Sequence, residues 1–146
     1  MATDAETLIV AARGWIGTPY IHQASLKGKG CDCIGLLRGV WREVKALSAD
    51  PEILPPYSPD WAEASGTETL YLGLKRHLTE IACDDVAPGA VVLFRMMRLG
   101  PAKHCAFVGV QDGGLTLIHA RMNKQVNEEP FSTSWRYKLA YAFEVP

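Results

Sequence analysis

The stretch that decides the predicted fold runs from His104 to Ala120 and reads HCAFVGVQDGGLTLIHA. Its first half alternates like a strand, with His104, Ala106, Val108 and Val110 on one face and Cys105, Phe107 and Gly109 on the other. Gln111-Asp-Gly-Gly114 is a hairpin turn signal. The return strand carries Leu115, Leu117 and His119 on one face. Pairing around this turn would bring His104 and His119 together near the open end of the hairpin.

Upstream of this hairpin the apolar residues follow helical spacing. Thr3-Asp-Ala-Glu6 is a capping box, followed by Leu8, Ile9, Ala12, Trp15 and Ile16, with Gly17 as the residue after the helix. A second helix is expected from Asp32, its N-cap, to Leu47, with Leu36, Leu37, Val40, Trp41, Val44 and Leu47 in one stripe. Ser65-Gly-Thr-Glu68 suggests a third helix, with Leu70, Leu74, Leu78 and Ile81 on one face.

Strands are expected to dominate the second half of the chain. Residues 90–94 form a continuous apolar run, and a last strand alternates through Leu139, Tyr141, Phe143 and Val145. Helices followed by an antiparallel meander predict an α+β fold class. The 146 residues suggest one domain, 1–146, with a proline-rich excursion at about 48–66 packed over the core.

Composition excludes several classes of function. The formal net charge of −1 argues against a protein that binds duplex nucleic acid by counterion release. No window has the roughly 18 uninterrupted apolar residues that a membrane span needs. The N-terminus lacks the basic and apolar regions of a secretory signal, so we expect synthesis and folding in the cytoplasm. Four cysteines in that compartment are more often packed thiols, metal ligands or nucleophiles than disulfides.

Cys33 is the candidate nucleophile. Just after the N-cap Asp32, its thiol would face unpaired backbone N–H groups and the positive end of the helix dipole, and both favour the thiolate. Taken alone, Cys33 would be better explained as a small buried hydrophobic residue. His104 and His119 change that balance, because on one hairpin face they supply a base and a group that orients it. Either histidine alone would be an ordinary core residue.

A metal site is the alternative for the same residues. Cys31 and Cys33, with His104 and His119, are ligand types for zinc, but structural zinc sites usually use C-x₂₋₄-C rather than C-x-C spacing. Cys105 should point away from His104. We therefore expect no metal and no cofactor. Cys31 is interpreted as a packed loop thiol, or, on a sharper hypothesis, as a partner that traps Cys33 on oxidation.

Several motifs in order resemble those of the NlpC-type papain-like cell-wall peptidases. They are Gly17-Thr-Pro-Tyr20, Gly30-Cys-Asp-Cys33-Ile-Gly-Leu36, Pro88-Gly-Ala-Val-Val-Leu-Phe94, Lys103-His104 and Ile118-His119-Ala120. The resemblance covers the chain from about Ala11 to its end. Gln23-Ala-Ser-Leu-Lys-Gly28, the length and the missing export signal look most like the phage and gene-transfer-agent branch.

The resemblance implies a role for each matching residue. Cys33 would be the nucleophile, His104 the general base and His119 the residue that orients it. Tyr20 would line the site near the oxyanion or the substrate amine, and Asp32 would help to bind the free amine of a stem peptide. Members of this family hydrolyse peptidoglycan stem peptides, typically between D-glutamate and a diamino acid, on a papain-like α+β core.

Two positions depart from the family pattern. Ile34 replaces the usual Ser after the nucleophile, which removes a hydroxyl that could contact the stem peptide. Ala90 replaces an acidic residue after Pro-Gly, which affects only a turn.

Other functions remain open at the level of sequence. One is a thiol acyltransferase or amidase of the same fold, and another is an inactive structural component of a phage tail. A wall substrate conflicts with the missing signal peptide unless the protein is built into a phage-like particle and acts on the recipient's wall. We therefore expect a peptidoglycan stem peptide, and with it phage-like tail proteins, as partners.

Overall fold

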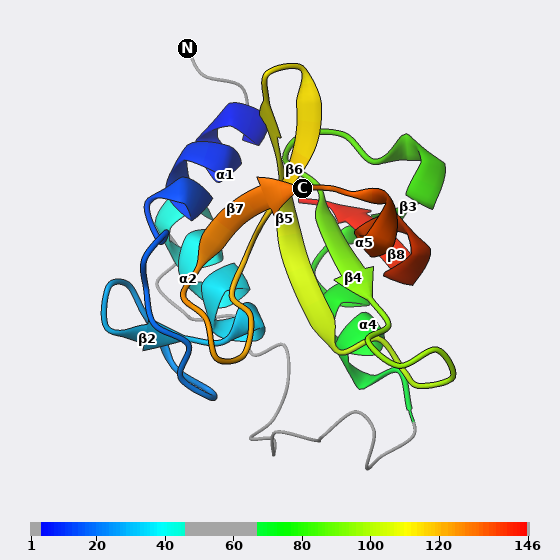
Figure 1. Ribbon diagram of the computed structural model, residues 1–146, viewed down its shortest axis with the longest axis horizontal. Coiled ribbons are helices and arrows are strands. Elements are labelled where there is room, and N and C mark those ends of the chain that lie inside the picture. The colour runs from blue at the N-terminus through cyan, green and yellow to red at the C-terminus, as the bar shows by residue number, and fades with distance from the viewer. Residues whose placement is uncertain (1–3, 46–66, 146) are drawn as a thin grey trace.

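The computed structural model describes residues 4–45 and 67–145, and it has the predicted α+β fold (Figure 1). Its helices are α1 (Asp4–Arg13), α2 (Cys33–Lys45), α4 (Thr69–Lys75), the 3-10 helix η1 (Cys83–Asp85) and α5 (Thr133–Lys138). Its strands are β1 (Ser25–Leu26), β2 (Gly30–Cys31), β3 (Thr79–Ile81), β4 (Val91–Phe94), β5 (His104–Gln111), β6 (Gly114–His119), β7 (Asn127–Pro130) and β8 (Leu139–Glu144). No helix within these two ranges is long and apolar enough to cross a membrane.

The β5–β6 hairpin lies inside a six-stranded antiparallel sheet of order β3-β8-β4-β5-β6-β7. Gln111 pairs with Gly114 across the turn. Asp112 and Gly113 both have positive φ, 51° and 80°, as a two-residue type I′ turn requires. The predicted hairpin is therefore confirmed, and so is its pattern of faces.

The sheet has an apolar core on each face. Cys105, Phe107 and Ile118 pack on one side with residues of α1, α2 and α4. Ala106, Val108 and Leu117 pack on the other side with Phe131 and with Trp135 of α5. Figure 1 shows α1 and α2 together beside the sheet, with α5 lying well apart from them. Because β5 is buried on both faces, its alternation sends successive side chains into different cores.

The third helix is shorter than the sequence predicts. It begins at Thr69 and ends at Lys75, so Leu78 is buried in the following turn and Ile81 belongs to β3. Glu68 occupies the N-cap position without making a side-chain cap. Its carboxylate instead binds Arg95 and the backbone N–H of Ala102, the latter at 3.1 Å. Tertiary contacts with the loop before β5 override the local capping signal here.

The predicted alternation of the last strand is wrong at one position. Tyr141 and Phe143 pack against the core shared with α2, but Leu139 packs against the opposite core. The cause is a shift in pairing: Leu93 pairs with Tyr141 while Phe94 pairs with Leu139. Such a bulge inserts one residue and reverses the face of everything beyond it.

The first helix also ends earlier than predicted. After Arg13 the chain continues in tight turns to Ile16, which is exposed rather than packed. Gly17 has a φ of 95° and still ends this winding, but it is not the residue directly after the α-helix. Thr3, Leu47, Ser65 and the excursion at 48–66 lie outside the described residues.

Candidate active site

Asp32 fixes the start of α2. Its Oδ1 accepts a hydrogen bond from the backbone N–H of Gly35 at 2.7 Å, and this bond is the N-cap that the sequence predicts. Its Oδ2 accepts a hydrogen bond from the backbone N–H of Gln23 at 2.8 Å. A Cβ on Gly35 would lie 1.8 Å from the carbonyl oxygen of Ala24, so only glycine allows this loop to approach the helix. These contacts hold Cys33 as the first residue of α2.

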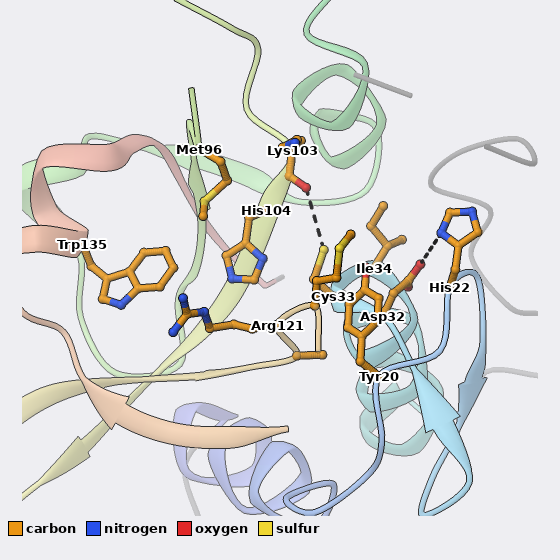
Figure 2. Close-up of a pocket in the computed structure, with 12 residues that line it drawn as sticks. Tyr20, His22, Asp32, Cys33, Ile34, Met96, Lys103, His104, Arg121 and Trp135 are labelled. Carbon is orange, nitrogen blue, oxygen red and sulfur yellow. Dashed lines mark hydrogen bonds and ion pairs between the residues drawn. The ribbon is translucent and has the colours of Figure 1, made fainter. Parts of the chain in front are cut away.

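Cys33 lies in the centre of a pocket, with His104 and Tyr20 beside it (Figure 2). Its sulfur is 3.9 Å from the carbonyl oxygen of Lys103. A hydrogen bond with Cys105 and a second with His104 lower the pKa of the Cys33 thiol to about 5, although burial opposes them. The thiolate is therefore the stable form of Cys33 at neutral pH, as a nucleophile requires.

Cys105 reaches Cys33 from the opposite face of the strand that carries His104. Its Sγ lies 3.3 Å from the backbone oxygen of Cys33 and is buried in the core shared with α2. The predicted opposition of His104 and Cys105 is thus confirmed, but Cys105 is not remote from the site. Contact with Cys33 and burial raise the pKa of Cys105, so its S–H stays available as a donor.

Cys31 differs from Cys33 in its surroundings. It is fully buried in β2, and burial, followed by the charges of Asp32 and Cys33, raises its pKa to about 12. A protonated, inaccessible thiol is a poor nucleophile, which favours the packing interpretation over an oxidative partner. Among the described residues no group of three or more His, Cys, Asp or Glu side chains has an arrangement that could hold a metal ion.

The two histidines are in contact. Nε2 of His104 lies 2.8 Å from Nδ1 of His119, and the side chains are 8% and 0% exposed. Burial, followed by the proximity of His104, lowers the pKa of His119 to about 4, so His119 is neutral at pH 7. The structure therefore brings Cys33, His104 and His119 together in the order that the sequence predicts.

Two further residues extend this chain of contacts. Glu129 on β7 places Oε2 2.9 Å from Nε2 of His119, and its Oε1 accepts Nε1–H of Trp135 at 2.9 Å. Trp135 also stacks on His104, with ring centroids 5.6 Å apart. Neither residue could be predicted from a sequence pattern, because β7 reads Asn-Glu-Glu-Pro, without apolar alternation, and α5 spans only six residues.

The pocket has a volume of about 270 Å³. His22, Tyr20 and Asp32 lie on one side of Cys33 in Figure 2, with His104, Arg121 and Trp135 on the other. Tyr20 is half-buried, and burial followed by the charge of Cys33 raises its pKa, so it remains a neutral phenol. The predicted site residue Asp32 lines the pocket as well, although both of its oxygens already accept backbone N–H groups.

Solved structures with a similar fold include several NlpC/P60 domains. No protein-family model matches the chain, and no curated protein sequence matches it. The NlpC/p60 domain of the peptidoglycan hydrolase SagA is 19% identical, with a TM-score of 0.64 over 99% of this chain and 100% of that domain. An NlpC/P60 family protein from Bacillus cereus is 20% identical, with a TM-score of 0.66 over 97% of this chain.

The likeness extends to a protein without catalytic function. RipD from Mycobacterium tuberculosis, a non-catalytic NlpC/p60 domain protein, is 12% identical, with a TM-score of 0.62 over 100% of both chains. The chain spans 40% of the length of the Bacillus cereus protein, so it corresponds to one part of that molecule. This chain has the fold of the NlpC/P60 domains.

Proposed function

We propose that this protein is a cysteine peptidase that hydrolyses a peptide bond in the stem peptides of bacterial peptidoglycan. The observation that carries the proposal is the thiol of Cys33 at a helix start, in contact with His104, whose second ring nitrogen is held by His119. Nucleophile, base and orienting group in this order form the arrangement that cysteine peptidases use.

The chemistry follows from these contacts. Cys33 gives its proton to His104, and the thiolate attacks the carbonyl carbon of the scissile bond, while the backbone N–H of Cys33 stabilises the oxyanion. His104 then protonates the leaving amine as the C–N bond breaks, which leaves a thioester on Cys33. Water, deprotonated by His104, hydrolyses the thioester and restores the thiol. No step needs a cofactor.

A peptidoglycan substrate is supported by the fold, because SagA, a peptidoglycan hydrolase, has the same one. Within that class we propose the bond between D-glutamate and a diamino acid, with Tyr20 near the oxyanion or the substrate amine. Asp32 contributes negative charge near the free amine of the stem peptide. Because Ile34 is apolar, the hydroxyl contact usual at this position is replaced by packing.

RipD shows that the fold can serve a non-catalytic protein, so the fold alone does not establish catalysis. The side chains favour catalysis here. An acidic Cys33 thiol and a neutral His119 behind His104 have no evident purpose in a purely structural component, since an apolar core would avoid the cost of burying them.

We further propose that the protein reaches the wall as part of a phage-like particle. The support for this is the sequence resemblance to the phage and gene-transfer-agent branch. Mass spectrometry of purified particles from the producing strain would detect the chain, and its absence there would contradict this part of the proposal.

Digestion of purified sacculi tests the activity. Wild-type protein should release muropeptides with new free diamino-acid amines, detected by mass spectrometry, and Cys33→Ala should release none. Cys83→Ala, which alters a thiol outside the pocket, is the matched control and should behave as wild type. Joined products would indicate a transferase, and equal inactivity of wild type and Cys33→Ala would indicate a structural role. Either outcome would contradict the proposal.

A further inference from the structure

The hydrogen bonds behind His104 determine where its proton lies. Glu129, a carboxylate, can only accept a hydrogen bond, so Nε2 of His119 must carry the proton in their 2.9 Å contact. Neutral His119 then has a bare Nδ1, which can only accept. Nε2 of His104, 2.8 Å away, must therefore be the donor. When His104 is neutral, the ring nitrogen left without a proton is therefore Nδ1, which is the nitrogen that can take up the proton of Cys33 when the thiolate forms.

We propose that Glu129 is a positioning residue of the proposed peptidase reaction. It sets the tautomers of neutral His119 and neutral His104 so that Nδ1 of His104 is the nitrogen that takes up the proton of Cys33. This inference rests on the proposed function for its role in catalysis. The tautomers themselves are a property of the folded protein and can be measured without a substrate.

The surroundings of Glu129 support a fixed carboxylate. The register of β6 and β7 pairs Glu129 with Leu117, two residues before His119 and on the same face. Burial raises the pKa of Glu129, but hydrogen bonds from His119 and Trp135 outweigh this effect. The net result is a lowered pKa, so the side chain stays ionised. Arg121 adds a positive charge, with Nη1 3.7 Å from the oxygen that His119 binds.

Trp135 makes the proposal unusually testable. Its Nε1–H can only donate, so in Glu129→Gln it would select the amide oxygen and turn the NH₂ group toward His119. His119 would then have to accept at Nε2 and carry its proton on Nδ1. That proton would face Nε2 of His104 and push the proton of His104 onto Nδ1. Neutral His104 could then no longer take up the proton of Cys33 at Nδ1, so formation of the thiolate would be disfavoured.

Removal of the Trp135 donor should reverse this effect. In Glu129→Gln combined with Trp135→Phe, the amide is free to rotate and offer its oxygen to His119, a rotamer that Arg121 also favours. Trp135→Phe alone keeps the carboxylate and an aromatic ring beside His104. It is therefore the matched control for the double variant.

The first measurement follows catalysis. Glu129→Gln should lower kcat on sacculi by about 10²- to 10⁴-fold, the range for loss of a correctly oriented base. The double variant should recover at least tenfold of this loss. Its activity is compared with that of Trp135→Phe alone, which measures the separate effect of changing a ring that lines the pocket. If Glu129→Gln retains wild-type activity, or if the double variant is as inactive as the single one, the proposal is overturned.

The second measurement separates this inference from the proposed function. Histidine ¹⁵N spectra of Cys33→Ala, in which no thiolate perturbs His104, should show His119 protonated at Nε2 and His104 at Nε2. Adding Glu129→Gln should move both protons to Nδ1, and adding Trp135→Phe as well should return them. If this pattern is not observed, the proposed effect of Glu129 on the two tautomers is overturned, even if the enzyme is active. If the expected pattern is observed in a protein that leaves sacculi intact, the role of Glu129 in setting the tautomers is upheld, and the proposed peptidase activity is contradicted.

Discussion

At the scale of single residues, the pKa of Cys33 is low because two consecutive residues of β5, on opposite faces of the strand, both interact with it. His104 and Cys105 are neighbours on β5, yet His104 lines the pocket with Cys33, whereas Cys105 contacts Cys33 in the core, with its Sγ 3.3 Å from the backbone oxygen of Cys33. The hydrogen bond with Cys105 is the largest influence that lowers the pKa of Cys33. A core thiol thus acts on the candidate nucleophile without lining the pocket.

Cys105→Ala should raise the pKa of Cys33 by about one pH unit, because a hydrogen bond to a charged group is worth roughly 1.5–3 kcal/mol and a thiol is a weak donor. Iodoacetamide alkylation of Cys33, followed by intact mass against pH, would show a midpoint near 5 in wild type and a higher one in the variant. Cys83→Ala is the control, since that half-buried thiol lies beside Ala140. Coincident profiles for Cys105→Ala and wild type would contradict the role of Cys105.

At the scale of elements, the start of α2 depends on one carboxylate. Asp32→Ala removes both the cap to Gly35 and the bond to Gln23, so the free energy of unfolding should fall by about 2 kcal/mol. Asp32→Asn keeps an acceptor oxygen for the cap and should lose less than half as much. Urea unfolding followed by tryptophan fluorescence measures both.

The same pair of variants tests the proposed substrate contact of Asp32. If its charge binds the free amine of a stem peptide, Asp32→Asn should raise KM on muropeptides while the protein stays folded. An Asn variant as unstable as the Ala variant would show that charge, rather than the cap, holds the helix. An unchanged KM in a stable Asn variant would limit Asp32 to its structural role.

At the scale of the whole molecule, a neutral buried His119 makes the fold sensitive to acid. Its pKa of about 4 in the folded state lies below the ordinary 6.5, so the unfolded chain binds more protons between these values. Stability is therefore complete above pH 6.5 and is lost as the pH falls toward 4. A shift of this size corresponds to about 3 kcal/mol.

Urea unfolding at pH 7 and pH 4 would measure this loss. Cys33→Ala is the appropriate parent, because the depressed pKa of Cys33 produces a change of the same sign between pH 9 and 5. Adding His119→Asn, which cannot titrate, should reduce the difference between the two pH values by about 3 kcal/mol. Equal differences in the two proteins would show that His119 is not held neutral in the fold.

Local sequence patterns were sufficient to predict the hairpin, the N-cap of α2 and the proximity of His104 to His119. That Cys33 joins this pair was suggested by the chemistry of a helix start and by the family resemblance. The hairpin, the N-cap and the histidine pair depend on short-range rules: alternation along a strand, a turn with two left-handed residues, and an aspartate before a helix. The α+β class followed from the same patterns. The single domain and the proline-rich excursion stay predictions.

The residues that surround Cys33, His104 and His119 are brought there by contacts between distant segments of the chain. Glu129 and Trp135 come from short elements without periodicity, and only the register of β7 on β6 brings Glu129 to His119. Contacts between distant segments also explain two other differences. One is the bulge that places Leu139 on the opposite face of the sheet, and the other is the early end of α4 at Lys75. Alternation and capping act within a few residues, whereas register is a property of two strands and cannot be inferred from either alone.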